Sequence, residues 1–328
     1  MSRNRLPTLL TIGVFLLIYA GCALQFPTML SARVGANLLN DSAYLGILAI
    51  GMTIVIVSGG IDLSVGAAMA FTTMLLAVAI ANWGMDPWLA FALALAIGTA
   101  FGALLGAAIH YLEAPPFIAT LTAMFLARGA CLMMSGDSIP VRHPLYQALG
   151  EAALPLPGGA RLSLLAIVML LAFAAGGLLL HRTRFGASVF AIGGNRHSAI
   201  LLGVPVARTT ILIYAVSGFC AALAGIAFSL YTQAGYALSG VGLELDVIAA
   251  AVIGGALLSG GAGTMVGTFF GMLIQALILT YIVFDGTLSS WWAKIATGAL
   301  LFAFVLAQRL TGAERLRLWN FPGRSRAA

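Results

Sequence analysis

The side chains that usually carry out catalysis are few in this chain and lie scattered along it. Its histidines share no spacing with a cysteine or an acidic residue that would suit a metal or a nucleophile–base pair. They are His110, His143, His181 and His197. No GxxxxGK[ST] stretch is present, and the only lysine is Lys294. The sequence thus argues against an enzyme and predicts that the chain itself holds no nucleotide, metal or other cofactor.

Composition identifies lipid as the main solvent of the chain. Of its 328 residues, 61% are hydrophobic and only 8% are charged, and the mean hydropathy is +1.05. A soluble domain carries about 25% charged residues, so these charges are too few to cover a globule of this length. The net charge of +6 would suit nucleic acid, but the arginines fall between apolar runs and instead report membrane orientation. We expect no nucleic-acid partner.

About ten apolar runs approach the length of a membrane-crossing helix. They lie near 8–25, 42–58, 64–82, 88–110, 115–134, 162–181, 209–232, 245–259, 264–284 and 288–308. Because lipid cannot satisfy an open backbone, each run should be helical. The expected fold is all-α, a single polytopic membrane domain over 1–328. Cys22, Cys131 and Cys220 lie in these runs and should be buried and inert.

The arginines predict which side of the membrane each end occupies. With the N-terminus inside, the outer side holds only Arg33, Arg142 and Arg161, and both termini are cytoplasmic. The outer loop 135–161 is rich in proline and glycine and should form an ordered, irregular cap. The inner loop 182–207 is far longer than a connector needs, and its Asn195 and Ser198 suit the caps of short helices. This loop should be a docking surface, the alternative being a stretch that rests on anionic lipid.

Two glycine-rich segments predict an internal repeat. The sequences SGGIDLSVG at 58–66 and SGGAGTMVG at 259–267 share the pattern SGGxxxxVG. Both fall at the inner end of a pair of runs, which gives the two copies the same orientation. Parallel half-repeats of this kind are common in transporters. Chance similarity between two glycine-rich stretches is the alternative.

Charged residues inside the runs need partners. Asp62 should cap the start of the helix 64–82 or pair with an arginine, and a proton or sodium site is the alternative. Arg128 lies deep in the run 115–134, where a lone charge is costly. We expect it to pair with Glu244 or Asp246, either as a structural bridge or as part of a substrate path.

Several motifs together resemble one family of membrane proteins, the ribose/xylose/galactoside class of bacterial ABC-importer permeases. The motifs are SGGIDLSVG, PPFIATLTAMFLARG (115–129), RTRFG and AIGGN within 182–195, and AAAVIGGALLSGGAGTMVGT (249–268). The stretches SLYTQAGYALSGVGLELD (229–246) and FDGTLSSWWAKIA (284–296) are most similar to the second permease subunit of galactofuranose importers. The resemblance covers nearly the whole chain in order.

The resemblance implies a bacterial inner-membrane permease subunit that translocates a monosaccharide, in particular a furanose such as galactofuranose. It implies a heterodimer with a sister permease, an ABC ATPase that binds ATP and magnesium, and a periplasmic sugar-binding protein. The coupling segment of the family maps onto 191–203, with Gly194, Asn195, Ala199 and Gly203 as its matching positions. An acidic residue often found in that segment is absent here.

The path for the sugar is the remaining question. Its expected helix-break residues are Ser58, Gly59, Gly60, Asp62 and Ser64. Hydrogen bonds to sugar hydroxyls are expected from a second set of polar residues, each of which could instead join two helices. This set is Asn40, Thr53, Gln233, Gln275 and Tyr281. The alternative function is a stand-alone secondary transporter driven by protons or sodium.

Overall fold

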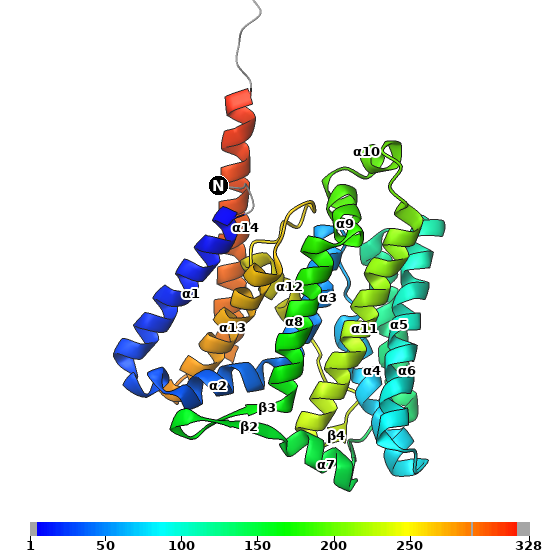
Figure 1. Ribbon diagram of the computed structural model, residues 1–328, viewed down its shortest axis with the longest axis vertical. Helices are drawn as coiled ribbons and strands as arrows, with labels where there is room; N and C mark the ends of the chain where they lie inside the picture. Colours follow the sequence, from blue (N-terminus) through cyan, green and yellow to red (C-terminus); the bar gives the residue numbers. More distant parts are fainter. Residues whose placement is uncertain (1–4, 290, 320–328) are drawn as a thin grey trace, which may run out of the picture.

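The computed structural model describes residues 5–289 and 291–319, with side chains placed for 7–289 and 291–308. The chain forms a bundle of helices with two small antiparallel hairpin-like sheets at one end (Figure 1). In chain order the elements are α1 (Arg5–Gln25), η1 (Pro27–Leu30), α2 (Ala32–Asp41), α3 (Ala43–Val57), α4 (Val65–Ala77), η2 (Val78–Asn82), α5 (Pro87–Tyr111), α6 (Pro116–Met134), β1 (Ile139–Pro140), α7 (Pro144–Glu151), β2 (Ala153–Leu156), η3 (Pro157–Gly159), β3 (Ala160–Ser163), α8 (Leu164–Arg182), α9 (Arg184–Gly194), α10 (Arg196–Leu201), α11 (Val206–Thr232), β4 (Ala234–Gly235), α12 (Leu243–Ile253), α13 (Met265–Asp285) and α14 (Trp291–Trp319).

Eight helices in the described residues are long and apolar enough to cross a membrane, or up to nine if the bent pair α2–α3 counts as one span. The expectation of about ten spans is therefore met only in part. The run 42–58 is α3, and the run 245–259 is α12 followed by loop. With 11 residues, α12 is only about 16 Å long, half of what a bilayer requires.

Glycine explains why α12 stops early. Gly254 is its C-cap, and Gly255 follows in the left-handed region with φ +92°. A methyl group on Gly254 would lie 2.5 Å from the carbonyl carbon of Gly267, so the backbone of α12 touches α13 there. The sequence shows these glycines, but it does not predict that α12 and α13 contact each other there.

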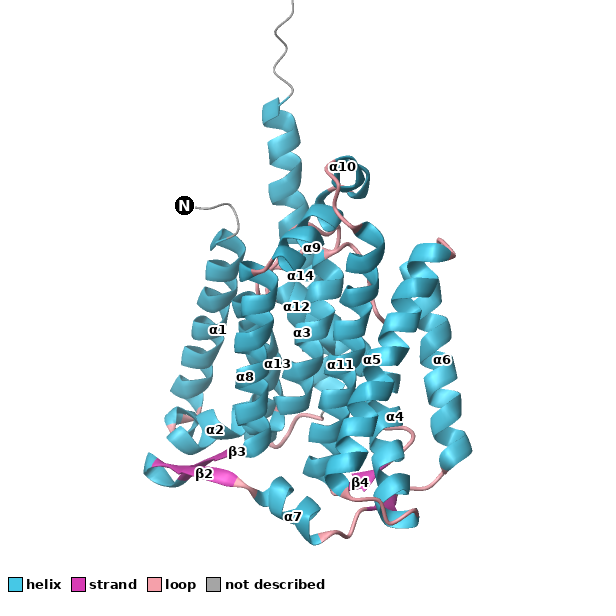
Figure 2. Cartoon of the chain, turned by 45° about the vertical axis from the view of Figure 1, so that its right-hand side comes forward, coloured by secondary structure: helices cyan, strands magenta, loops and turns pink. Residues whose placement is uncertain are grey.

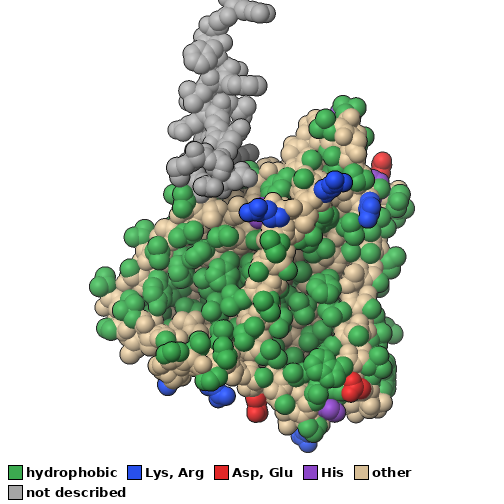
Figure 3. Space-filling view, viewed as in Figure 1, with side chains coloured by type: hydrophobic (Ala, Val, Ile, Leu, Met, Phe, Trp, Pro, Cys, Tyr) green, Lys and Arg blue, Asp and Glu red, His purple; other side chains and the backbone are tan. Residues whose placement is uncertain are grey.

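The two ends of the bundle differ. One end carries α9 and α10, together with the start of α1 and the end of α14, and we call it the α10 face (Figure 1). The opposite end carries α7 and the pair β2–β3, and we call it the α7 face (Figure 2). On the side that Figure 3 shows, charged side chains lie near these two ends and hydrophobic side chains cover the band between them. This distribution is that of a protein held in a bilayer.

The outer loop is more regular than the sequence suggests. Within 135–161 the chain forms α7 and the strand β2, which pairs with β3 from Ala153↔Ser163 to Leu156↔Ala160. The turn between these strands uses Gly158 and Gly159, whose φ angles are +77° and +72°. The proline–glycine cluster thus builds a tight hairpin rather than an irregular cap.

α11 is the central helix, packed against α5, α3 and α4. Small residues allow this close approach: a methyl group on Gly102 of α5 would lie 2.0 Å from the carbonyl oxygen of Tyr214 on α11. Such contacts replace the hydrophobic driving force that is missing between helices in lipid. All three cysteines are free and buried, as predicted.

Candidate functional site

The loop 182–207, predicted to be the inner one, forms two short helices, as the sequence predicts. Thr183 caps α9, and Asn195 caps α10 by accepting a hydrogen bond from the Ser198 amide (2.8 Å). Ser198 is therefore the donor at this cap and not a cap itself. Ala199 is buried among apolar residues of the same loop, and Gly203 makes the turn toward α11 with φ +76°.

Beneath α9 three backbone segments meet. The Gly261 amide, in the second glycine-rich segment, donates a hydrogen bond to the carbonyl oxygen of Val57, at the end of α3 (2.8 Å). A methyl group on Gly193, near the end of α9, would lie 1.8 Å from that oxygen and 2.6 Å from the Gly261 nitrogen. A methyl group on Gly260 would lie 2.9 Å from the Cα of Gly59. We call these five residues (Val57, Gly59, Gly193, Gly260 and Gly261) the glycine junction.

The glycine junction joins the two predicted half-repeats to the predicted docking loop. α3 and α12 both run toward the α10 face before their glycine-rich segments, and α4 and α13 both run back (Figure 1). The repeat itself stays a prediction, since similar direction does not establish common structure. Sequence reasoning missed the contact of Gly193, although the pair Gly193–Gly194 beside Asn195 was the available signal.

The first glycine-rich segment contains the predicted helix break. Ser58 ends α3 with its hydroxyl donating to the Val55 carbonyl (2.7 Å), and Gly59 has φ +86°. Gly60 faces α11, because a methyl group there would lie 2.6 Å from the Tyr214 hydroxyl. Among the described residues that hydroxyl is buried and has no hydrogen-bond partner.

Asp62 neither caps α4 nor pairs with an arginine whose side chain the structure describes, so neither expectation is met there. The N-cap of α4 is Ser64, with no side-chain cap bond. The Asp62 carboxylate accepts from the Ser64 amide (3.0 Å), the Ser64 hydroxyl (2.6 Å) and the Ser217 hydroxyl of α11 (2.7 Å), and only 2% of the residue is exposed. Three donors satisfy the charge locally, which sequence spacing cannot reveal because Ser217 is distant in the chain.

The expected pairing of Arg128 with Glu244 or Asp246 is also wrong. The Arg128 guanidinium donates to the carbonyl oxygens of Ala237 and Ser239 (2.8 Å to Ser239). Asp246 instead forms an ion pair with Lys294 of α14. Backbone carbonyls without a helical partner are a good substitute for a carboxylate, because each supplies a free lone pair.

The expected sugar-contact residues mostly join elements of the chain. The Asn40 side chain of α2 donates to the Arg161 carbonyl of β3 (2.8 Å). The hydroxyls of Thr53 and Thr268 are 2.7 Å apart and link α3 to α13. These bonds match the alternative role of joining two helices.

Two of the remaining three residues of that set, Gln275 and Tyr281, also join elements of the chain, whereas Gln233 differs. Gln275 donates to the Asp246 carbonyl (2.8 Å), and the Tyr281 hydroxyl donates to the Gln25 side chain (3.0 Å). Gln233 ends α11 in the left-handed region, and its Oε1 is buried without a partner among the described residues. A role of any of the five in sugar binding stays a prediction.

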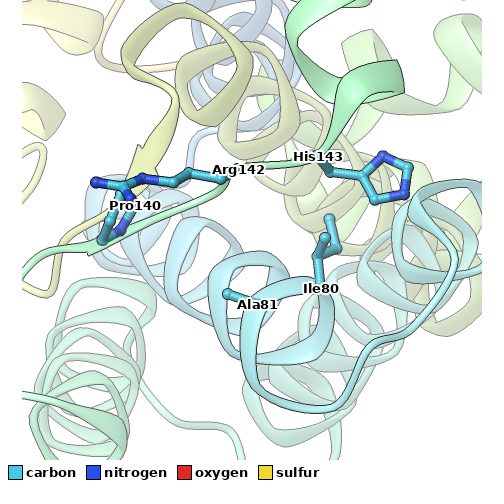
Figure 4. Close-up of a pocket in the computed structure, with 5 residues that line it drawn as sticks. All are labelled: Ile80, Ala81, Pro140, Arg142 and His143. Carbon is cyan, nitrogen blue, oxygen red and sulfur yellow. The ribbon is translucent and has the colours of Figure 1, made fainter.

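A cavity of about 450 Å³ lies on the α7 face (Figure 4). It is lined by Ile80, Ala81, Pro140, Arg142 and His143, and the side chains of Arg142 and His143 extend in different directions. Ile80 and Ala81 end the span that begins with α4, so this cavity lies at the opposite end of that span from Asp62. It is a surface feature, separate from the glycine junction.

Comparison with known proteins agrees with this architecture of a transport protein. Residues 35–305 match the family described as branched-chain amino acid transport system / permease component. The inner membrane ABC transporter permease protein YjfF of Escherichia coli is 56% identical over 94% of this chain and 93% of its own length. The fructose import permease FruG of Bifidobacterium longum and the ribose import permease RbsC of Bacillus subtilis are each 37% identical, over 94% and 91% of this chain and 92% and 91% of theirs. No solved structure matches the chain.

The bundle of membrane-length helices and these matches together identify an integral membrane permease. The chain belongs to the ABC-transporter permease family of that description. It is a transport subunit of the inner membrane and not itself an enzyme.

Proposed function

We propose that this chain is one of two permease subunits of an ATP-driven importer that carries a monosaccharide, in furanose form, across the inner membrane. Galactofuranose is the substrate that the sequence motifs favour. The partners are a sister permease, an ABC ATPase that binds ATP and magnesium, and a periplasmic sugar-binding protein. The relatives named as fructose and ribose import permeases support the sugar class.

The α10 face is assigned to the cytoplasm and the α7 face to the periplasm. The arginine distribution supports this orientation, because the loop that carries α9 and α10 contains Arg182, Arg184 and Arg196. The ATPase would then contact α9 and α10, and the binding protein would deliver sugar at the α7 face.

The glycine junction is the observation that carries the mechanism. α9 touches the end of α3 and the second glycine-rich segment backbone to backbone, so displacement of α9 moves both. ATP binding can shift this equilibrium only if the two nucleotide states of the ATPase contact α9 and α10 differently. Movement of α3, α4 and α13 then switches access to the path.

An ion-coupled secondary transporter is the less supported alternative. Its best candidate site, Asp62, is already satisfied by three donors. The family description raises a second substrate class, branched-chain amino acids, which the test must include.

Reconstitution tests the proposal. The chain is co-expressed with its neighbouring ATPase, permease and binding-protein genes, and the purified complex is placed in liposomes with radiolabelled D-galactose, D-ribose, D-fructose or L-leucine. We expect ATP-dependent sugar uptake that requires the binding protein, and no leucine uptake.

Uptake by this chain alone on an ion gradient would refute the proposal, and leucine uptake would refute the sugar assignment. A complex with two copies of this chain and no sister permease would refute the heterodimer.

A further inference from the structure

The segment 234–242, between α11 and α12, runs from the α7 face into the interior of the bundle. It begins on the α7 face, where β4 pairs with β1 (Ile139↔Gly235). It then follows α4 toward the α10 face: a methyl group on Gly235 would lie 2.4 Å from the Thr73 carbonyl oxygen, and Gly240 lies against Gly66. From Gly66 to the end of η2 at Asn82 the helical rise is about 24 Å. The segment therefore ends deep within the membrane-crossing part of the bundle.

Two hydrogen bonds from neighbouring helices also place the segment below the α7 face, at smaller depths than the distance along α4 gives. Arg128, which donates to the Ser239 carbonyl (2.8 Å), lies about 9 Å of helical rise from the end of α6 at Met134. Gln275, which donates to the Asp246 carbonyl (2.8 Å), lies about 15 Å from the end of α13 at Asp285. Both helix ends belong to the α7 face. α12 is thus a half-length helix whose first turn starts inside the membrane.

After β4, residues 236–242 of this segment have irregular backbone and are only partly covered. Leu238 is 47% exposed, Val241 is 68% exposed, and Leu245 in the first turn of α12 is 62% exposed. Irregular backbone at membrane depth is not stable against lipid, and it occurs only where other protein covers it or where it lines a water-filled cavity. In the assembled transporter this surface must therefore face away from lipid.

A charged side chain next to the segment indicates whether protein or water covers this surface. Two acidic residues stand in the first turn of α12. Asp246 is neutralised by Lys294, whereas the Glu244 carboxylate, which lies beside Gly66 of α4, has no hydrogen bond or ion pair within the described part of the chain. An unpaired carboxylate at this depth is costly against apolar protein or lipid and is tolerated in contact with water. An aqueous path along this surface would satisfy the Glu244 carboxylate, whereas apolar protein or lipid would not.

We propose that segment 234–242 and the first turn of α12 line the route of the sugar, and that Glu244 is the residue that binds it in transit. A carboxylate can accept two hydrogen bonds from neighbouring hydroxyls of a sugar. Tyr236, 39% exposed on the same segment, adds an aromatic ring and a hydroxyl. Arg128 positions this wall by holding the carbonyls of Ala237 and Ser239. The proposal rests on the proposed function and names the site within it.

Water access is tested first, in membranes that contain the whole transporter. Single cysteines are introduced as Val241→Cys and, as a control on a regular helix, Leu171→Cys, which is similarly exposed (65%) in the middle of α8. The charged, water-soluble reagent MTSET reacts with the thiolate, which forms in water and not in lipid. We expect Val241→Cys to react at least about tenfold faster than Leu171→Cys. Equal, slow reaction at the two positions would overturn the proposal, whether or not the complex transports sugar.

The role of the carboxylate is tested in the reconstituted complex with Glu244→Gln. The sugar concentration that gives half-maximal uptake reflects the binding protein, so this variant should leave it unchanged. Loss of one charge-assisted hydrogen bond should lower the maximal uptake rate about tenfold. Asp137→Asn, exposed on the α7-face loop, is the matched control. Wild-type uptake by Glu244→Gln would refute the assignment of Glu244. Absence of ATP-dependent uptake in the unaltered complex would instead refute the proposed function, and the labelling result would be unaffected.

Discussion

Gly193 is a residue at which the structure leaves no room for a side chain. A methyl group on Gly193 would lie too close to both the Val57 carbonyl oxygen and the Gly261 nitrogen, which are hydrogen-bonded to each other (2.8 Å). Its neighbour Gly194 has nothing within 4 Å of an added methyl group. Packing therefore requires glycine at position 193 but not at position 194.

Gly193→Ala should destabilise the protein by about 1–3 kcal/mol, because the methyl group forces α9 away from α3. Gly194→Ala should leave the stability unchanged or raise it slightly, since alanine is favoured over glycine in a helix. Thermal unfolding of the purified variants in detergent compares the two. If both variants unfold at the same temperature, the glycine junction is not packed as described.

At the scale of elements, the half-length helix α12 and the paired helices α9 and α10 show where sequence reasoning succeeds and where it fails. Hydropathy located all the helices that cross the bundle, and Asn195 predicted the start of α10 correctly. Hydropathy overestimated the length of α12, because the apolar run continues past Gly254 whereas the helix ends where it contacts α13. Apolar residues look alike in a helix and in a buried loop.

The pairings of charged residues were predicted less well than the helices. Arg128 was expected to pair with a carboxylate but donates hydrogen bonds to backbone carbonyls, and Asp62 accepts a hydrogen bond from Ser217. Both partners lie far away in sequence, on elements brought together only by tertiary packing. One chain without relatives for comparison carries no information on which distant residues approach each other.

Asn195→Ala should loosen α10 without unfolding α9. The lost cap is worth about 1 kcal/mol, which corresponds to a fall of about fivefold in the hydrogen-exchange protection of residues 197–201. Hydrogen exchange read by mass spectrometry gives the protection of each peptide. The α9 peptide serves as an internal control because its own cap, Thr183, is unchanged. Equal losses in both peptides would mean that the two helices unfold as one unit.

For the whole molecule, orientation is the property on which every proposed contact depends. In the proposed orientation the α10 face meets the ATPase and the α7 face meets the binding protein. The three native cysteines are buried, with Cys22 7%, Cys131 0% and Cys220 6% exposed, so they give little background in labelling experiments.

Single cysteines on opposite faces should therefore report the orientation. In intact cells a membrane-impermeant maleimide should label Ala148→Cys, exposed on α7, and should label Ser198→Cys, exposed on α10, only after the membrane is opened. The reverse pattern would place α10 in the periplasm and would rule out its contact with the ATPase. The unsubstituted chain is the control.

The absence of side chains at the glycine junction has a mechanical consequence. Two helices that touch through long side chains can slide by an ångström or more while the side chains change rotamer, so part of any push is absorbed. The atoms that meet at Val57, Gly193 and Gly261 belong to the backbone and have no rotamers to change. We therefore expect a small tilt of α9 to displace α3 and the second glycine-rich segment together, by nearly the same distance.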